Sequence, residues 1–196
     1  TSFFFGRARE KARSRVANAL RRRRRSLRAR SMLGSARDFA AAGARICLCP
    51  NTEGNLGDGI CDLATMRDAG IPIAIGTDLN SRIAPAEDLR WIEYVQRVRH
   101  QMRGAVTDGA GRSGGALLDI ATVNGAASLG VESGSISLGR LADFVAIDLD
   151  HRTLQGVEPD HLADAIVMGT GPECLAGTCV GGTWVRGGPD AARGGG

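Results

Sequence analysis

The chain has 196 residues, 43% of them hydrophobic, and a formal net charge of +4, which is the composition of a globular protein. No apolar run approaches the roughly 20 residues of a membrane span, so no membrane-spanning helix is expected. Five cysteines, an odd number with no secretory leader, predict reduced thiols in a cytoplasmic protein.

A basic head at positions 1–35 differs in character from the rest of the chain. Positions 1–30 hold 12 basic residues and one acidic residue, which leaves 13 basic against 20 acidic residues in the remainder. The run Arg21–Arg25 permits three interpretations: an arm that binds nucleic acid, an acid-poor targeting peptide, or foreign sequence joined to a truncated domain by, for example, a frameshift. We favour the third, because the character changes abruptly near Ser35 and the chain begins with Thr1.

The segment after the head predicts a βαβ unit of a parallel sheet. Its expected elements are a helix tail, an apolar strand, a polar glycine-rich loop, a helix and a second apolar strand, at residues 36–42, 44–49, 51–59, 61–69 and 71–75. This order is typical of parallel strands joined by a crossover helix. Cys47 and Cys49 would share one face of the first strand, and we interpret them as buried structural thiols.

The second strand ends in Gly76-Thr77-Asp78, which makes Asp78 the first candidate for a catalytic residue. The strand is apolar throughout, as expected of a strand covered on both faces. A carboxylate at the C-terminal end of such a strand lies where (β/α) barrels carry their chemistry. The alternative is that these three residues form only a turn from strand to loop.

The remaining expected elements are a helix, a flexible linker, an amphipathic helix and four short β segments, at residues 85–103, 104–115, 116–129, 134–139, 142–148, 165–168 and 174–185. We interpret the acidic Glu87, Asp88 and Glu93 of the first of these helices as a solvated face. The short strands predict a small β-sandwich. The tail at 187–196 is expected to be disordered.

Three blocks of sequence resemble a known family. They are CPNTEGNLGDG at 49–59, GTD at 76–78 with EDLRWIEYVQR at 87–97, and GSI at 134–136 with GRLADFVAID at 139–148. The third block resembles the C-terminal signature of the amidohydrolase superfamily. The first two resemble its formimidoylglutamate deiminase branch, which acts in histidine degradation, and the resemblance covers about residues 36–185.

The resemblance implies an α/β fold: the C-terminal portion of a (β/α)8 TIM-type barrel at residues 36–130, plus part of an appended β-sandwich at residues 131–186. It implies one zinc ion that activates water for attack on an amidine-like carbon of a small-molecule substrate. By resemblance, Asp78 is a ligand of the metal and also handles the proton. Glu53 and Asn55, in the loop that borders the pocket, are candidates for substrate binding.

The family's other metal ligands are histidines, and this chain does not match them. His100, His151 and His161 are the three histidines here, and we interpret each as a surface or structural residue. One carboxylate cannot hold zinc, because three protein ligands are the usual minimum of a catalytic site. We therefore expect the chain to be incomplete and inactive alone, with a complementing chain or a homodimer as partner.

Two alternatives remain open. The chain is either part of another deaminase of the superfamily or a non-catalytic fragment whose basic head binds nucleic acid. No aromatic residue lies among the arginines of the head to stack on bases, which counts against recognition of single strands. A nucleic-acid partner is therefore the less favoured reading, and no membrane partner is expected.

Overall fold

The computed structural model describes residues 36–188 of the chain, so the three interpretations of the basic head lie outside the described residues. Residues 36–41 are helical, and Gly43 follows with a φ of 68°, which confirms the predicted helix tail and its glycine stop. In the described part, no helix is long and apolar enough to cross a bilayer.

A parallel pair of strands forms the first half of the described chain, as predicted. Strand β1 (Ile46–Leu48) pairs with β2 (Ile73–Ile75), with Ile46 opposite Ile73. Helix α3 (Leu63–Asp68) lies between them in the sequence and begins at Asp62, whose carboxylate accepts the Thr65 N–H at 3.3 Å. The apolar strands and this capped helix therefore give the βαβ unit that the sequence predicts.

The loop predicted at 51–59 is wrong over most of its length, because residues Pro50–Leu56 form helix α2. Pro50 occupies the first helical position, where its missing N–H costs no hydrogen bond. Glu53 accepts the Cys49 N–H through Oε1 at 2.9 Å, and Gly57 closes the helix with a φ of 71°. These signals at the helix ends outweigh the low helix propensity of the asparagines and Gly54.

Helix α4 (Pro85–His100) is the longest helix of the described part. Its apolar stripe is buried at Leu89 and Ile92 but ends at Val98, which is 80% exposed. The interpretation of its acidic residues as a solvated face is wrong for two of them, since Asp88 is 2% exposed and Glu93 is 0% exposed. Both carboxylates accept backbone N–H groups from neighbouring segments, which stabilises them away from water.

Two predicted features between α4 and the C-terminal sheet differ in the structure. The predicted linker at 104–115 holds Val106 in the core with 2% exposure, and its last residues begin helix α5 (Ser113–Ala121). The single helix predicted at 116–129 is broken, so that α6 (Val123–Leu129) follows as a separate helix. The break lies at Thr122, whose ψ of −82° is not helical and whose hydroxyl shares the Leu118 carbonyl with its own N–H, at 2.8 Å and 2.9 Å.

The C-terminal part contains one antiparallel sheet in the order β3-β4-β5, where the sequence predicted part of a β-sandwich. Its strands are Phe144–Ile147, Leu175–Val180 and Thr183–Gly187. The predicted strand at 165–168 is wrong, because these residues belong to helix α7 (Leu162–Gly169). A short apolar run does not distinguish a buried strand from a helix. The strand predicted at 134–139 is also absent, and turns and bends take its place.

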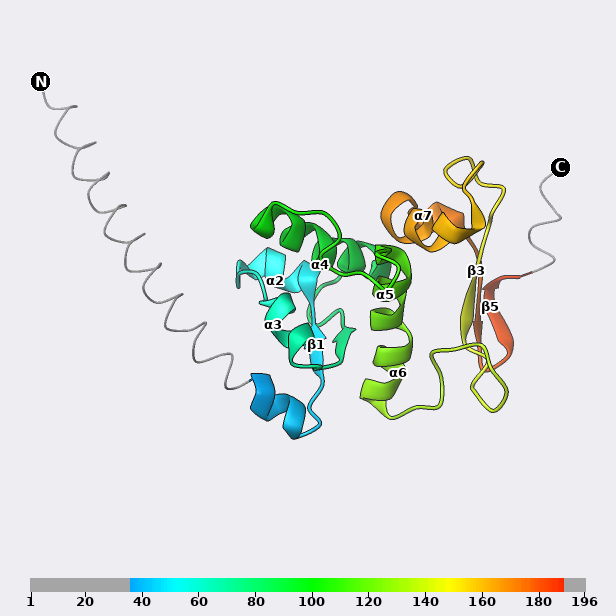
Figure 1. Cartoon of the computed structure of the whole chain (residues 1–196). Helices are drawn as coiled ribbons and strands as arrows, with labels where there is room; N and C mark the ends of the chain where they lie inside the picture. Colours follow the sequence, from blue (N-terminus) through cyan, green and yellow to red (C-terminus); the bar gives the residue numbers. More distant parts are fainter. Residues whose placement is uncertain (1–35, 189–196) are drawn as a thin grey trace, which may run out of the picture.

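One apolar core joins the elements of the first half to α7. Figure 1 shows α2 to α6 grouped around β1, with α7 and the three-stranded sheet beyond α5. The buried members of the core come from β1, α3, β2, α4, the segment before α5, α5 itself and α7: Leu48, Leu63, Ile73, Leu89, Ile92, Val106, Leu117, Ile120 and Val167. Burial of these side chains supplies the main driving force for folding.

The strands β1 and β2 pair only with each other within the described residues, so each has an outer edge without a neighbouring strand. The outer edge of β2 has one hydrogen-bonded contact from a helix. The Asn124 side chain on α6 donates from Nδ2 to the Ile73 carbonyl at 2.9 Å.

Candidate functional site

The candidate site lies where β1 and β2 end together. Helix α2 begins directly after β1, and Gly76-Thr77-Asp78 follows β2. Because the strands are parallel, both segments leave the sheet at the same end, where the strands have their C-termini. The Thr52 hydroxyl donates to the Thr77 carbonyl at 3.1 Å and joins the start of α2 to the turn. The structure therefore brings the GTD turn and the start of α2 together.

Asp78 takes a left-handed backbone conformation with a φ of 47°, and its side chain is exposed. Few residues with a side chain adopt this conformation, although aspartate and asparagine do so more readily than most. The carboxylate is therefore presented to solvent at the end of the sheet. This placement agrees with the predicted position of a reactive carboxylate, although it is also compatible with a simple turn.

The thiol of Cys47 on β1 and that of Cys49, one residue beyond the strand, lie on the same side of the chain, close to Gly76. A Cβ atom added to Gly76 would lie 2.9 Å from the Cys47 sulfur and 3.4 Å from the Cys49 sulfur. The shared face was predicted, but the prediction that both thiols are buried is wrong, because Cys47 is exposed. Burial, with smaller contributions from the nearby Cys47, Asp78 and Glu53, raises the pKa of Cys49 to about 11. Cys49 is thus a neutral thiol at pH 7.

Glu53 and Asn55 do not lie on one surface. They are two residues apart on α2 and therefore face different sides of the helix. Glu53 is half-buried and lines a cavity between α2 and α4, whereas Asn55 is exposed. Neither Asn55 nor Asp78 lines that cavity. The three candidate residues thus belong to one region of the fold but do not converge on one pocket within residues 36–188.

The residues present do not form a metal centre. Within residues 36–188, no group of three or more histidine, cysteine, aspartate or glutamate side chains could hold a metal ion. His100 is exposed at the end of α4, and His161 is exposed in a 3-10 turn. His151 lies in the C-terminal part, with Nδ1 3.2 Å from the Cys174 sulfur. Asp78 is a single candidate ligand, whereas a catalytic zinc usually has three from the protein.

Asp88 is a buried carboxylate beside the site that sequence reasoning missed. Its Oδ1 accepts the Asn51 N–H at 3.0 Å, which joins the start of α4 to the start of α2 beside the GTD turn. Burial raises the pKa of Asp88 above its usual 3.8, and the hydrogen bond from the Asn51 N–H partly opposes this change. This contact is visible only in the folded structure, because 37 residues separate the two partners in the sequence.

Replacing Asp88 with asparagine is expected to raise stability at pH 7, with a gain that shrinks towards pH 4. The raised pKa means that the neutral carboxyl group stabilises the fold. This contribution is fully present below pH 3.8, the usual value, and is lost as the pH rises through the folded pKa. Asparagine stays neutral and still offers an oxygen to Asn51. Urea unfolding of both proteins between pH 4 and 7 measures the difference.

Asp119→Asn, at an exposed position on α5, serves as the control for this comparison. Its difference in unfolding free energy from the parent chain should vary little over the same pH range. A difference between Asp88→Asn and the parent that stays constant with pH would contradict the assigned effect of burial.

Comparison with known proteins identifies the family. Residues 25–185 match the model of the Amidohydrolase family, and the chain therefore belongs to this family. The formimidoylglutamate deiminase of Pseudomonas aeruginosa is 35% identical over 148 residues, which cover 75% of this chain and 33% of that protein. The 5-methylthioadenosine/S-adenosylhomocysteine deaminase of Halobacterium salinarum is 31% identical over 151 residues, which cover 76% of this chain and 33% of that protein.

Solved structures agree with this assignment. An amidohydrolase from Brucella melitensis has a TM-score of 0.69 at 30% identity, covering 82% of this chain and 37% of that chain. An adenosine deaminase from Xanthomonas campestris with bound zinc has a TM-score of 0.68 at 22% identity, covering 79% and 35%, which is a likeness of fold. The resemblance to the amidohydrolase superfamily is therefore confirmed. The chain spans about a third of the length of the curated relatives that it matches.

Proposed function

We propose that this chain is the C-terminal portion of a zinc-dependent formimidoylglutamate deiminase. The observation that carries the proposal is the 35% identity to the Pseudomonas aeruginosa enzyme, which extends over three quarters of this chain. The reaction adds water to the formimidoyl carbon of N-formimidoyl-L-glutamate and breaks its bond to the imino nitrogen, which leaves as ammonia, while the glutamate nitrogen keeps the resulting formyl group. An exposed carboxylate at the end of a parallel strand supports this chemistry.

Asp78 is the residue that we propose for the proton transfer. Its carboxylate would take a proton from the attacking water and return one to the departing nitrogen. Glu53 and Asn55, on the helix that follows β1, are proposed to contact the substrate. Thr52 supports this arrangement, because its hydroxyl bond to Thr77 fixes the helix beside the turn that carries Asp78.

Zinc remains part of the proposal because two solved neighbours are described with zinc, the adenosine deaminase above and an atrazine chlorohydrolase from Arthrobacter aurescens. The described residues do not fit a complete zinc site, since Asp78 is one candidate ligand among them. The remaining ligands must then come from outside the described residues. We propose a complementing polypeptide, or a second copy of the chain, as their source.

The second candidate is a deaminase that acts on 5-methylthioadenosine or S-adenosylhomocysteine. The Halobacterium salinarum enzyme favours it, since its 31% identity spans 76% of this chain. The sequence identity to the Pseudomonas aeruginosa protein is four percentage points higher over a similar length. We therefore place the formimidoyl substrate first.

The deciding experiment joins residues 36–188 to the preceding two thirds of the Pseudomonas aeruginosa enzyme and measures ammonia release. We expect turnover of N-formimidoyl-L-glutamate but not of 5-methylthioadenosine. Asp78→Asn should lower kcat by about 10²–10⁴-fold, the range of a general acid or base. Asp68→Asn, on the exposed end of α3, should leave the rate within about twofold, because surface substitutions are usually close to neutral.

Two results would contradict the proposal. Turnover of the adenosine compound alone would transfer the chain to the second candidate. A well-folded Asp78→Asn protein with the rate of the parent would remove Asp78 from the chemistry.

A further inference from the structure

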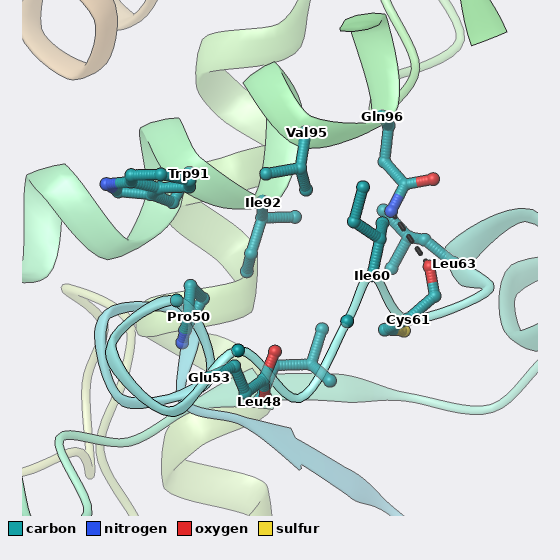
Figure 2. Close-up of a pocket in the computed structure, with 13 residues that line it drawn as sticks. Leu48, Pro50, Glu53, Ile60, Cys61, Leu63, Trp91, Ile92, Val95 and Gln96 are labelled. Atoms are coloured by element: carbon teal, nitrogen blue, oxygen red, sulfur yellow. Dashed lines mark hydrogen bonds between the residues drawn. The ribbon is translucent and has the colours of Figure 1, made fainter. Parts of the chain in front are cut away.

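A cavity of about 270 Å³ lies between α2, the segment at 57–61 and α4. Its walls are mainly apolar, as Figure 2 shows, with Ile92 and Val95 from α4 and Leu48 from β1 around the hollow. Glu53 and Trp91 also line it. Asp78 does not line this cavity, but Glu53, one of the two residues proposed to contact the substrate, does. Its volume is below the roughly 300–1,000 Å³ of pockets for drug-sized ligands, so it suits a smaller molecule.

The Glu53 carboxylate gives the cavity a negative charge. One carboxylate oxygen accepts the Cys49 N–H, and no ion pair within residues 36–188 involves Glu53. Burial, with a smaller contribution from the Glu53 carboxylate, raises the pKa of the Cys61 thiol to about 11. The thiol is therefore neutral at pH 7 and adds no charge to the cavity. A carboxylate that lies among apolar side chains is stabilised when a cation binds next to it.

Two polar groups near the cavity already have partners. Gln96, on the cavity wall, donates from Nε2 to the Cys61 carbonyl at 3.0 Å. Arg99 donates from Nη1 to the carbonyls of Ile60 and Cys61 at 3.0 Å and 3.2 Å. Its guanidinium group is thus held on the backbone of the segment at 57–61. The half-exposed indole of Trp91 adds an aromatic wall, which attracts cations through its π system.

We propose that this cavity binds a small organic cation with an apolar body, of the size of an arylmethylammonium ion. The ammonium group would pair with Glu53. The ring would fill the apolar space between Leu48 and Val95 beside Trp91. The site shares Glu53 with the proposed substrate contacts, but binding of the cation needs neither metal nor turnover, so its failure is measured separately from a failure of the proposed deaminase activity.

The test compares benzylammonium with benzyl alcohol, which has the same ring and nearly the same size but no charge. Calorimetric titration of the full chain should give a dissociation constant at least about tenfold lower for benzylammonium, equivalent to about 1.4 kcal/mol. Glu53→Gln keeps an oxygen for the Cys49 N–H but removes the charge. In this variant the two ligands should bind within about threefold of each other, since a neutral amide does not prefer a cation.

A matched pair of substitutions on α4 tests the location. Val95→Phe fills the cavity and should abolish binding of benzylammonium. Val98→Phe, at a position 80% exposed on the same helix, should leave binding within about twofold. Circular dichroism of each variant verifies folding, and the α4 pair decides the location even if Glu53→Gln does not fold.

Three results would overturn the proposal. One is equal affinity of the parent chain for the charged and neutral ligands. Another is no heat of binding at concentrations up to about 10 mM, which corresponds to less than about 3 kcal/mol of affinity. The last is unchanged binding in a folded Val95→Phe protein.

Discussion

Replacing Gly114 with alanine is expected to lower the free energy of unfolding by about 3 kcal/mol, the upper end for overpacked sites. Gly114 lies in the first turn of α5, where that helix meets α7. A Cβ atom at this position would lie 2.5 Å from the Ala163 carbonyl oxygen and closer still to the Asp164 nitrogen. Both are backbone atoms, so no change of rotamer relieves the clash. The two helices would have to separate.

The same shift would disturb a hydrogen bond at this contact. The Gly114 N–H donates to Asp164 Oδ1 at 2.6 Å and thus has a partner at the start of α5, where backbone N–H groups have none within the helix. Separation of α5 from α7 would lengthen this bond while the groups remain partly buried. The loss of packing and the loss of this bond therefore act in the same direction.

The adjacent Gly115 provides a matched control. A Cβ atom there would meet nothing nearer than an Asp108 carboxylate oxygen at 3.8 Å, an ordinary contact. Gly115→Ala should raise stability by about 0.5–1 kcal/mol, because alanine has the higher helix propensity. Urea unfolding of both variants at one protein concentration, with m values compared to the parent, measures the contrast. Equal stability of the two variants would contradict the close approach of α5 and α7.

Removal of the Glu93 side chain should also destabilise the fold strongly. Glu93→Ala is expected to lower the free energy of unfolding by about 3–5 kcal/mol, as for other buried charge pairs that lose one partner. The carboxylate is 0% exposed and accepts three hydrogen bonds. Its donors are the Val106 N–H at 2.7 Å, the Ala105 N–H at 3.0 Å and the Arg97 Nε–H at 2.7 Å.

The effect should extend beyond α4, because Glu93 holds the segment that contains Val106 in the core. Arg67 on α3 donates to the carbonyls of Ala105 and Thr107 at 2.8 Å and 2.9 Å, so the segment contacts both helices. Loss of Glu93 should therefore speed proteolysis at this segment as well as lower stability.

Glu87→Ala, on the same helix, is the control for Glu93→Ala. Glu87 pairs with Arg82 at 2.5 Å, but the Arg82 side chain is 69% exposed. Such surface pairs contribute about 0–1 kcal/mol. Limited proteolysis and urea unfolding should thus separate the two variants clearly. A Glu93→Ala protein as stable as Glu87→Ala would show that the buried carboxylate is dispensable.

The sequence predicted those parts of the fold that depend on local signals. The apolar strands around Ile46 and Ile73 and the proline at the start of α4 gave correct elements because pattern and end signals agree there. Helix α2 was missed because Asn51, Gly54 and Asn55 are typical of loops. The proline at its start and the glycine at its end are helix signals, but the composition between them favoured a loop.

The candidate site was predictable in part for a similar reason. Asp78 follows an apolar strand, and that position is visible in the sequence. The buried acids Asp88 and Glu93 look like surface residues on a helix until α2 and the segment at 104–107 are placed against them. The cavity beside Glu53 could not be predicted from the sequence either, because its walls come from segments that meet only in the folded chain.

The hydrogen bond from Asn124 to the Ile73 carbonyl occupies part of one outer edge of the small parallel sheet, the edge formed by β2. An exposed strand edge can recruit an incoming strand from another polypeptide, and a capped carbonyl obstructs that recruitment. A strand that pairs with β2 on this side would have to displace the side-chain amide of Asn124, which lies on α6. Pairing of a further strand with β2 therefore competes with a side chain 51 residues distant in the sequence.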